Sequence, residues 1–282
     1  MLMKKAKSTL SSVLLVCLSL IWLSPIYIIL ANSFKSRDEM YVNPLGMPVK
    51  FSLEYYSGAM EKMNFLRAFG VSLVITIVSV AIIVVLCAMA AWMMARSNGK
   101  LSKAIYYTLI LTMLIPFQTL MMPLMQEMNS LEKLLGIQIK DTIGGLIFMY
   151  IGFGAGMGVF MFYGFVKGSL PRTLEEAAII DGCNTWQLFW RVVFPLMKPT
   201  IITLVILDVI WIWNDYLLPS LTLKSASNRT IPIGTQIFFG QYTIEWNMAM
   251  AALMLTIIPV VVFYLCAQKH IVKGVAAGAV KG

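Results

Sequence analysis

Residues 169–199 read SLPRTLEEAAIIDGCNTWQLFWRVVFPLMKP, a charged stretch between two apolar runs that carries the signals of two short helices. Thr173 and Glu176 have the spacing of a capping box, which predicts that the first helix begins there. Asp181 and Gly182 predict its end, because glycine readily adopts the left-handed conformation that closes helices. The whole segment is named the hook below.

The second half of the hook predicts another short helix. Asn184 or Thr185 is the expected N-cap, and Pro195 and Pro199 are expected to close the helix. Its apolar residues recur at spacings of three and four and form one face. They are Leu188, Phe189, Val192 and Val193, with Trp186 nearby. We expect a partner protein to cover this face.

The composition indicates an all-α integral membrane protein. Hydrophobic residues make up 59% of the 282-residue chain and charged residues 12%, whereas soluble domains carry about 25% charged residues. Six apolar runs can each cross about 30 Å of hydrocarbon, for which a helix needs roughly 20 residues. They lie near residues 10–31, 69–95, 105–124, 143–166, 200–218 and 248–267. One transmembrane domain over residues 1–282 is therefore expected.

The distribution of basic residues predicts the orientation in the membrane. With the N-terminus inside, thirteen of the 22 lysines and arginines lie in cytoplasmic segments. The acidic residues outside the spans fall mainly on the other side. By the positive-inside rule both termini and the hook are cytoplasmic. The net charge of +9 thus reflects topology, and we expect the lipid bilayer and no nucleic acid as a partner.

The fifth apolar run carries polar groups into the membrane. Asp208, Trp211 and Asp215 share one helix face, with Asn214 beside them. An aspartate near the bilayer midplane is costly and must face water, a ligand or another helix. Aromatic rings flanked by carboxylate and amide groups suit a sugar on a translocation path. The alternative is an inter-helix hydrogen bond for Asp208 and interfacial anchoring for the aromatic residues.

The fourth run is rich in glycine, at positions 144, 145, 152, 154, 156 and 158. The overlapping GxxxG spacings in this run allow a neighbouring helix to approach closely. Ordinary tight packing is one interpretation, and a sliding surface needed for motion is the other.

Motifs for catalysis are missing from the chain. The sequence has no GxxxxGK[ST] loop for ATP phosphates, no HExxH and no GxSxG. The four cysteines have no metal-binding spacing. These absences argue against an enzyme, and we expect no catalytic residues, metal site or cofactor on this chain.

The hook resembles the EAA loop of ATP-binding-cassette importer permeases. That pattern is EAA, three residues, Gly, nine residues and Ile-x-Leu-Pro, and this chain matches it with Glu176-Ala177-Ala178, Gly182 and Val192-x-Phe194-Pro195. The wider form EEAAIIDGC…FPLMKP is similar to the carbohydrate-uptake branch, in particular to the second permease of maltose-type systems. Ser33-Phe34-Lys35, Trp213-Asn214-Asp215 and the ending 268–282 extend the resemblance over essentially the full chain.

The resemblance implies a type I importer permease with six transmembrane helices in the cytoplasmic membrane. Its partners would be a second homologous permease, two cytosolic ABC ATPase subunits that hold ATP and Mg, and an extracytoplasmic sugar-binding protein that touches residues 219–247. The ATPase-coupling residues would be Glu175, Glu176, Ala177, Ala178, Asp181, Gly182 and Pro195. The tail would also contact the ATPases, through Gly278, Ala279, Val280, Lys281 and Gly282.

Other functions stay open on sequence alone. A related branch of the same family carries glycerol-phosphate compounds. An ion-coupled secondary transporter would show inverted halves and broken midplane segments, and a membrane scaffold or channel subunit would need no ATPase hook. The sequence names no particular sugar.

Overall fold

The computed structural model describes the backbone of residues 2–97, 99–240 and 244–279, and the side chains of residues 11–97, 99–240 and 244–269. In these ranges the regular elements are all helices, joined by loops, apart from one isolated antiparallel bridge between Phe239 and Ile244. Four helices are long and apolar enough to cross a membrane, or up to six spans if each of two bent helix pairs counts as one.

The chain divides into two compact units. One comprises Met1–Leu66 and Gly234–Val261, and the other Arg67–Ile233 and Val262–Gly282. The first unit contains α1 (Leu2–Asn32), α2 (Arg37–Val42), α3 (Glu54–Lys62) and the first part of α14 (Trp246–Ala279). α13 (Ile231–Gln236) contributes residues to both units.

Within the first unit, three side chains at the end of α1 hold the loop that follows α2. They donate hydrogen bonds to three consecutive backbone carbonyls. These bonds are Tyr27 to Leu45 (3.0 Å), Asn32 to Pro44 (2.9 Å) and Lys35 to Asn43 (2.7 Å). The loop therefore folds back onto the helix end although it lacks regular structure.

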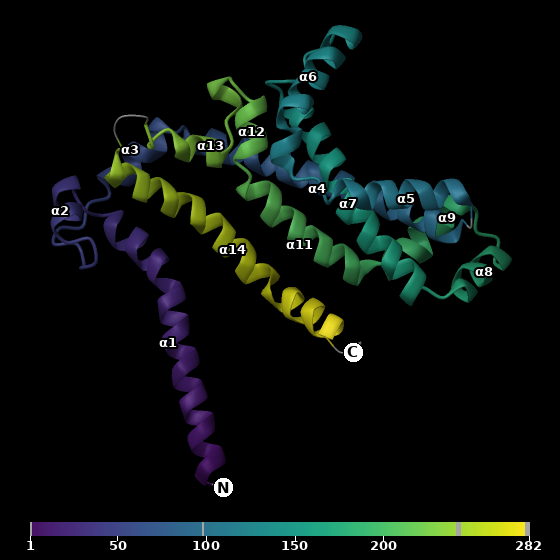
Figure 1. Ribbon diagram of the computed structural model, residues 1–282, viewed down its shortest axis with the longest axis horizontal. Helices are drawn as coiled ribbons and strands as arrows, with labels where there is room; N and C mark the ends of the chain where they lie inside the picture. The colour runs from purple at the N-terminus through teal and green to yellow at the C-terminus, as the bar shows by residue number, and fades with distance from the viewer. Residues whose placement is uncertain (1, 98, 241–243, 280–282) are drawn as a thin grey trace. The chain divides into compact units, whose positions relative to one another are not determined.

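Besides the end of α14, the second unit contains the helices that Figure 1 shows from blue through teal to green. The longer ones are α4 (Phe65–Arg96), α5 (Lys100–Thr112), α6 (Phe117–Leu135), α7 (Ile143–Ser169) and α11 (Lys198–Asn214). α7 packs against both α5 and α11. The shorter ones are α8 (Arg172–Ile180), α9 (Thr185–Leu188), the π-helical turn η1 (Phe189–Val193), α10 (Phe194–Leu196), α12 (Leu217–Thr222) and η2 (Ala226–Asn228).

The single helix predicted over residues 105–124 is instead broken in two. α5 ends at Thr112, α6 begins at Phe117, and the two helices are bent by 110°. Pro116 lies at the break as the N-cap of α6, with extended backbone angles. Proline has no N–H to continue the hydrogen-bond ladder, and it forces the preceding residue away from helical geometry.

The glycines of α7 let two neighbouring helices approach closely. A Cβ atom at Gly154 would lie 2.6 Å from Ile83, and one at Gly158 would lie 2.7 Å from Cys87, both residues of α4. At Gly156 it would lie 2.8 Å from Met113, the C-cap of α5. Gly152, by contrast, has nothing within 4 Å. Gly154, Gly156 and Gly158 therefore allow tight helix packing in this structure.

We predict that Gly158→Val destabilises the protein, because its side chain would force α7 away from α4. Overpacking of this kind costs about 1–3 kcal/mol, which would lower the midpoint of thermal unfolding in detergent. Gly152→Val is the matched control, since it makes the same change on the same helix into open space. Equal unfolding midpoints for the two variants would contradict the packing role.

Candidate functional site

The first helix of the hook, α8, begins earlier than its sequence predicts. Pro171 is the N-cap, with no side-chain capping bond, and the predicted capping box of Thr173 and Glu176 is wrong. Leu170 and Pro171 both have extended backbone, as expected before and at a proline that starts a helix. Thr173 therefore already lies inside the first turn.

The predicted end of α8 is confirmed. Asp181 is the C-cap, and Gly182 has a φ of +86°. A Cβ atom at Gly182 would meet nothing within 4 Å. This position therefore requires glycine for its left-handed backbone and not for lack of space.

The second half of the hook begins as predicted and continues further. Asn184 caps α9, with a full capping box to Gln187. Pro195 was predicted to close the helix, but the helical path runs through it to Leu196. The π-helical turn η1 lies directly before Pro195. A wider turn at this point accommodates a residue that cannot donate to the preceding ladder. The segment then bends by 73° into α11.

The hook is fastened to α4 by three side chains, Trp92, Arg96 and Glu175, which are named the latch. Arg96 Nη2 lies 2.6 Å from Glu175 Oε1, and Arg96 Nε also donates to this carboxylate. Trp92 Nε1 donates to Glu175 Oε2 at 3.2 Å. Arg96 also donates to the backbone carbonyl of Leu170 at 2.9 Å. Glu175 was predicted to be an ATPase-coupling residue, and its side chain faces α4 and is only 10% exposed.

The apolar face predicted to need a partner is covered largely by this chain itself. Leu188, Phe189 and Val193 are buried, and the ring of Phe189 lies 5.7 Å from that of Trp92. That prediction of an uncovered face is therefore wrong. The sequence pattern identified an apolar face correctly but could not show that α4 and the hook would meet.

Trp186, which lies beside the predicted face, and other apolar side chains are exposed on the hook. They are Leu174, Ile179, Ile180 and Trp186, with exposed fractions of 44%, 57%, 85% and 61%. Glu176, Ala177, Asp181, Gly182 and Pro195 are also exposed, whereas Ala178 is buried. Apolar residues beside small and acidic ones form a surface suited to a protein partner.

The four polar residues predicted on the fifth span do not form one site. Trp211 and Asp215 line a pocket of about 280 Å³, while Asp208 and Asn214 do not. Asp208 is buried, and its Oδ2 has no hydrogen-bond partner among the described residues. Asn214 donates to the carbonyl of Ile210.

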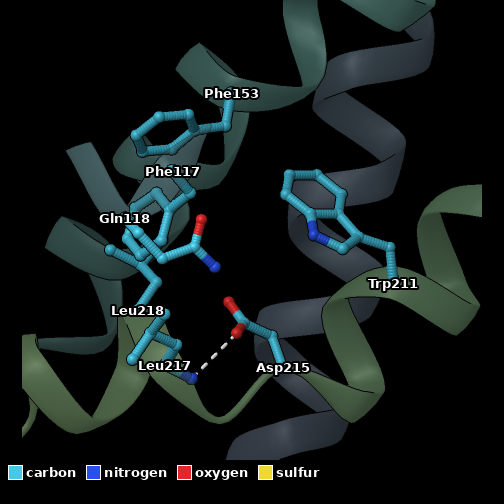
Figure 2. Close-up of a pocket in the computed structure, with 7 residues that line it drawn as sticks. All are labelled: Phe117, Gln118, Phe153, Trp211, Asp215, Leu217 and Leu218. Atoms are coloured by element: carbon cyan, nitrogen blue, oxygen red, sulfur yellow. Dashed lines mark hydrogen bonds between the residues drawn. The ribbon is translucent and has the colours of Figure 1, made fainter. Parts of the chain in front are cut away.

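The pocket is formed where α6, α7, α11 and α12 meet (Figure 2). Its lining residues are Phe117, Gln118, Phe153, Trp211, Asp215, Leu217 and Leu218. Figure 2 shows the Gln118 amide and the Asp215 carboxylate turned toward one another across the space. The sequence analysis missed Phe117, Gln118 and Phe153, because only the break at Pro116 brings the start of α6 to α11.

The position of Asp215 is fixed by two hydrogen bonds. Its Oδ2 accepts from the hydroxyl of Tyr150 at 2.9 Å, and its Oδ1 accepts from the backbone amide of Leu217 at 2.9 Å. The ring of Tyr150 also meets that of Trp211 edge-on, with 5.6 Å between centroids. The pocket therefore offers aromatic surface, one oriented carboxylate and one amide, which is a combination suited to polyhydroxylated ligands.

Residues 83–277 match the family model described as "Binding-protein-dependent transport system inner membrane component". The chain belongs to this family. It is 46% identical over 266 residues to the "Probable starch degradation products transport system permease protein AmyC" of Thermoanaerobacterium thermosulfurigenes, covering 94% of each chain. It is 31% identical to the "Melibiose/raffinose/stachyose import permease protein MelC" of Bacillus subtilis, covering 92% of this chain and 91% of the relative.

Solved structures show the same fold. A chain of a bacterial ABC transporter that imports the acidic polysaccharide alginate superposes with a TM-score of 0.79, at 21% identity and 94% coverage of this chain. The predicted all-α fold of an ABC importer permease is thus confirmed, with four to six candidate membrane-crossing helices among the described residues. The family match and the relatives confirm the predicted location in the cytoplasmic membrane.

The two remaining parts of the predicted site are the C-terminal tail and the loop 219–247. In the tail, Gly278 and Ala279 belong to the end of α14, while Val280, Lys281 and Gly282 lie outside the described residues. In the predicted contact loop 219–247, residues 224–228 are held by Asp141. Its Oδ1 accepts from the backbone amides of Lys224 (2.9 Å) and Ser225 (2.8 Å), and its backbone carbonyl accepts from Asn228.

The bonds at Asp141 depend on its charge. The hydroxyl of Ser225 also donates to Oδ2. This bond, followed by the bonds from backbone amides, lowers the pKa of Asp141 below its ordinary value. A lowered pKa means that the stabilisation is complete above the unfolded value of about 3.9 and is lost as the pH falls through the folded value.

We predict that Asp141→Gly frees residues 224–228, which would speed amide hydrogen exchange at Lys224 and Ser225. Asp141 has a φ of +57°, so glycine removes the carboxylate without straining the backbone. Asp141→Asn keeps an acceptor oxygen and tolerates this φ, and should exchange more slowly than the glycine variant. Unchanged protection in Asp141→Gly would exclude the anchoring role.

Proposed function

We propose that this permease is the transmembrane subunit of an ATP-driven importer that moves a neutral sugar or oligosaccharide inward by alternating access. A second permease would pair with it, two cytosolic ATPase subunits would bind ATP and Mg, and a binding protein would deliver the sugar. The relatives named above are described as permeases for starch degradation products and for melibiose, raffinose and stachyose. One solved relative is described in complex with a periplasmic protein bound to an alginate pentasaccharide.

The exposed surface of the hook carries the proposal. It presents Glu176, Ala177 and the turn at Gly182 beside the apolar side chains of Ile180 and Trp186. The excess of basic residues on one side of the membrane supports a cytoplasmic position for this surface. An ATPase would dock there, because the chain itself lacks a nucleotide-binding loop.

The pocket favours a neutral sugar over a glycerol-phosphate compound. Asp215 is the one charged side chain among the seven residues that line it. A carboxylate accepts hydrogen bonds from hydroxyl groups but repels phosphate. Trp211 and Phe153 offer flat rings on which the C–H faces of a sugar can rest.

The test uses the purified complex in proteoliposomes with its binding protein, and maltotriose as the probe of a starch-derived sugar. The proposal expects ATP-dependent uptake and stimulation of ATP hydrolysis by the sugar-loaded binding protein. Uptake driven by an ion gradient without an ATPase would contradict it.

We predict that Gly182→Trp abolishes uptake and that Gly182→Ala already reduces it. The φ of +86° is costly for any L-residue, by roughly 1–2 kcal/mol, so the turn that shapes the docking surface would shift. Gly168→Ala is the control, because Gly168 lies in α7 with open space around it. Membrane insertion should be normal in all three variants. Normal uptake by Gly182→Trp would show that Gly182 has no role in coupling to the ATPase.

We also predict that Trp211→Ala raises the maltotriose concentration needed for half-maximal uptake by about threefold to tenfold, because the sugar loses contact with one ring; a tenfold change corresponds to about 1.4 kcal/mol. Ile210→Ala on the same helix, outside the pocket, should leave this concentration unchanged. If both variants behave like the wild type, the sugar does not use this pocket.

Asp208→Ala addresses the buried carboxylate outside the pocket. We predict that it lowers uptake more than it lowers assembly of the complex. Equal loss of both, measured by uptake and by the amount of co-purified ATPase, would leave Asp208 with a structural role alone.

A further inference from the structure

α4 is a continuous helix that is long enough to emerge from both faces of a membrane. Its 32 residues run from Phe65 to Arg96 without a proline. At 1.5 Å per residue the helix spans about 48 Å, well beyond the roughly 30 Å of hydrocarbon. The two ends of α4 are therefore connected by one uninterrupted hydrogen-bonded helix.

At one end, α4 is tied to the hook through the latch. Arg96 pairs with Glu175 in α8 at 2.6 Å and donates to the carbonyl of Leu170 at the end of α7. The guanidinium thus joins three elements at one point. Because it makes several bonds to one carboxylate, the pair fixes direction as well as distance.

At the other end, α4 is tied to the loop that precedes α13. Arg67 Nε donates to the carbonyl of Ser227 at 2.8 Å, and Ser72 Oγ accepts from the backbone amide of Ile231 at 2.9 Å. Ser72 is only 3% exposed. Asp141 holds the same loop from the start of α7.

The bent helices of this unit are less suited to carry a displacement. α5 and α6 meet at 110°, and the second half of the hook meets α11 at 73°. The terminal residues at a break between two helices can absorb hinge motion, whereas α4 has no such break.

We propose that α4 is a strut that couples the hook to the loop at residues 227–231, with Arg96 and Glu175 positioning one end and Arg67 and Ser72 the other. This inference rests on the proposed function, in which an ATPase binds the hook and the binding protein approaches the loop. Through the strut, binding of the ATPase at the hook and of the binding protein at the loop would each affect the other, since coupling between two binding sites acts equally in both directions.

The test measures how strongly the sugar-loaded binding protein stimulates ATP hydrolysis by the reconstituted complex. Glu175→Gln loosens the latch while keeping its shape, and Ser72→Ala loosens the other end. Each should reduce the stimulation, measured per molecule of co-purified ATPase, by about threefold or more. Because the two contacts act in series on one helix, the double variant should lose little more than the worse single variant.

Matched controls exist for both ends. Ser79 is a buried serine on α4 whose hydroxyl has no hydrogen-bond partner among the described residues, so Ser79→Ala should keep full stimulation. Glu127 is an exposed carboxylate on α6, and Glu127→Gln should do the same. If Glu175→Gln fails to assemble, Arg96→Lys takes its place, since lysine keeps the charge but not the forked geometry.

The outcomes separate the two proposals. A wild-type complex with neither stimulation nor uptake overturns the proposed function, and the strut with it. A stimulated wild type whose Glu175→Gln and Ser72→Ala variants are stimulated equally overturns the strut alone. The strut is also overturned if the reduction in stimulation in the double variant equals the product of the reductions in the two single variants. It is overturned as well if stimulation falls only in proportion to the amount of bound ATPase.

Discussion

The interaction between Arg96 and Glu175, which lie 79 positions apart in the sequence, decides how the hook is attached to the membrane part of the protein. Both side chains are largely removed from water, at 18% and 10% exposure. Removing one partner from such a pair leaves an uncompensated charge, which typically costs about 3–5 kcal/mol. Trp92 and the carbonyl of Leu170 complete the environment of the two charges, and the hook therefore has a defined direction relative to α4.

Close packing between α4 and α7 supports this attachment. Gly154 and Gly158 allow the backbone of α7 to lie against Ile83 and Cys87. Without this close approach, the end of α7 would not lie within reach of Arg96. These glycines therefore help to position the hook although they lie outside it, because they set the separation between α4 and α7.

The hook and the pocket are linked directly through α11. This helix leaves the hook at Lys198 and ends at Asn214, beside Asp215, a distance of about 25 Å for 17 helical residues. A movement of the hook would therefore also reach Trp211 and Asp215 through the covalent chain. The bend of 73° at the start of α11 distinguishes this route from the uninterrupted helix α4.

Local chemistry in the sequence determined the membrane class, the apolar runs, the glycine turn at Gly182 and the cap at Asn184, because each depends on neighbouring residues or on composition. The sequence did not determine that Glu175 faces α4 and Glu176 faces outward, since both positions are acidic and adjacent. Nor did it place Phe117 and Gln118 beside Asp215, because that contact needs the break at Pro116 and the packing of helices distant in sequence. Tertiary structure decides such pairings, as they depend on which buried surfaces meet, and residue spacing along one helix carries no information about its neighbour.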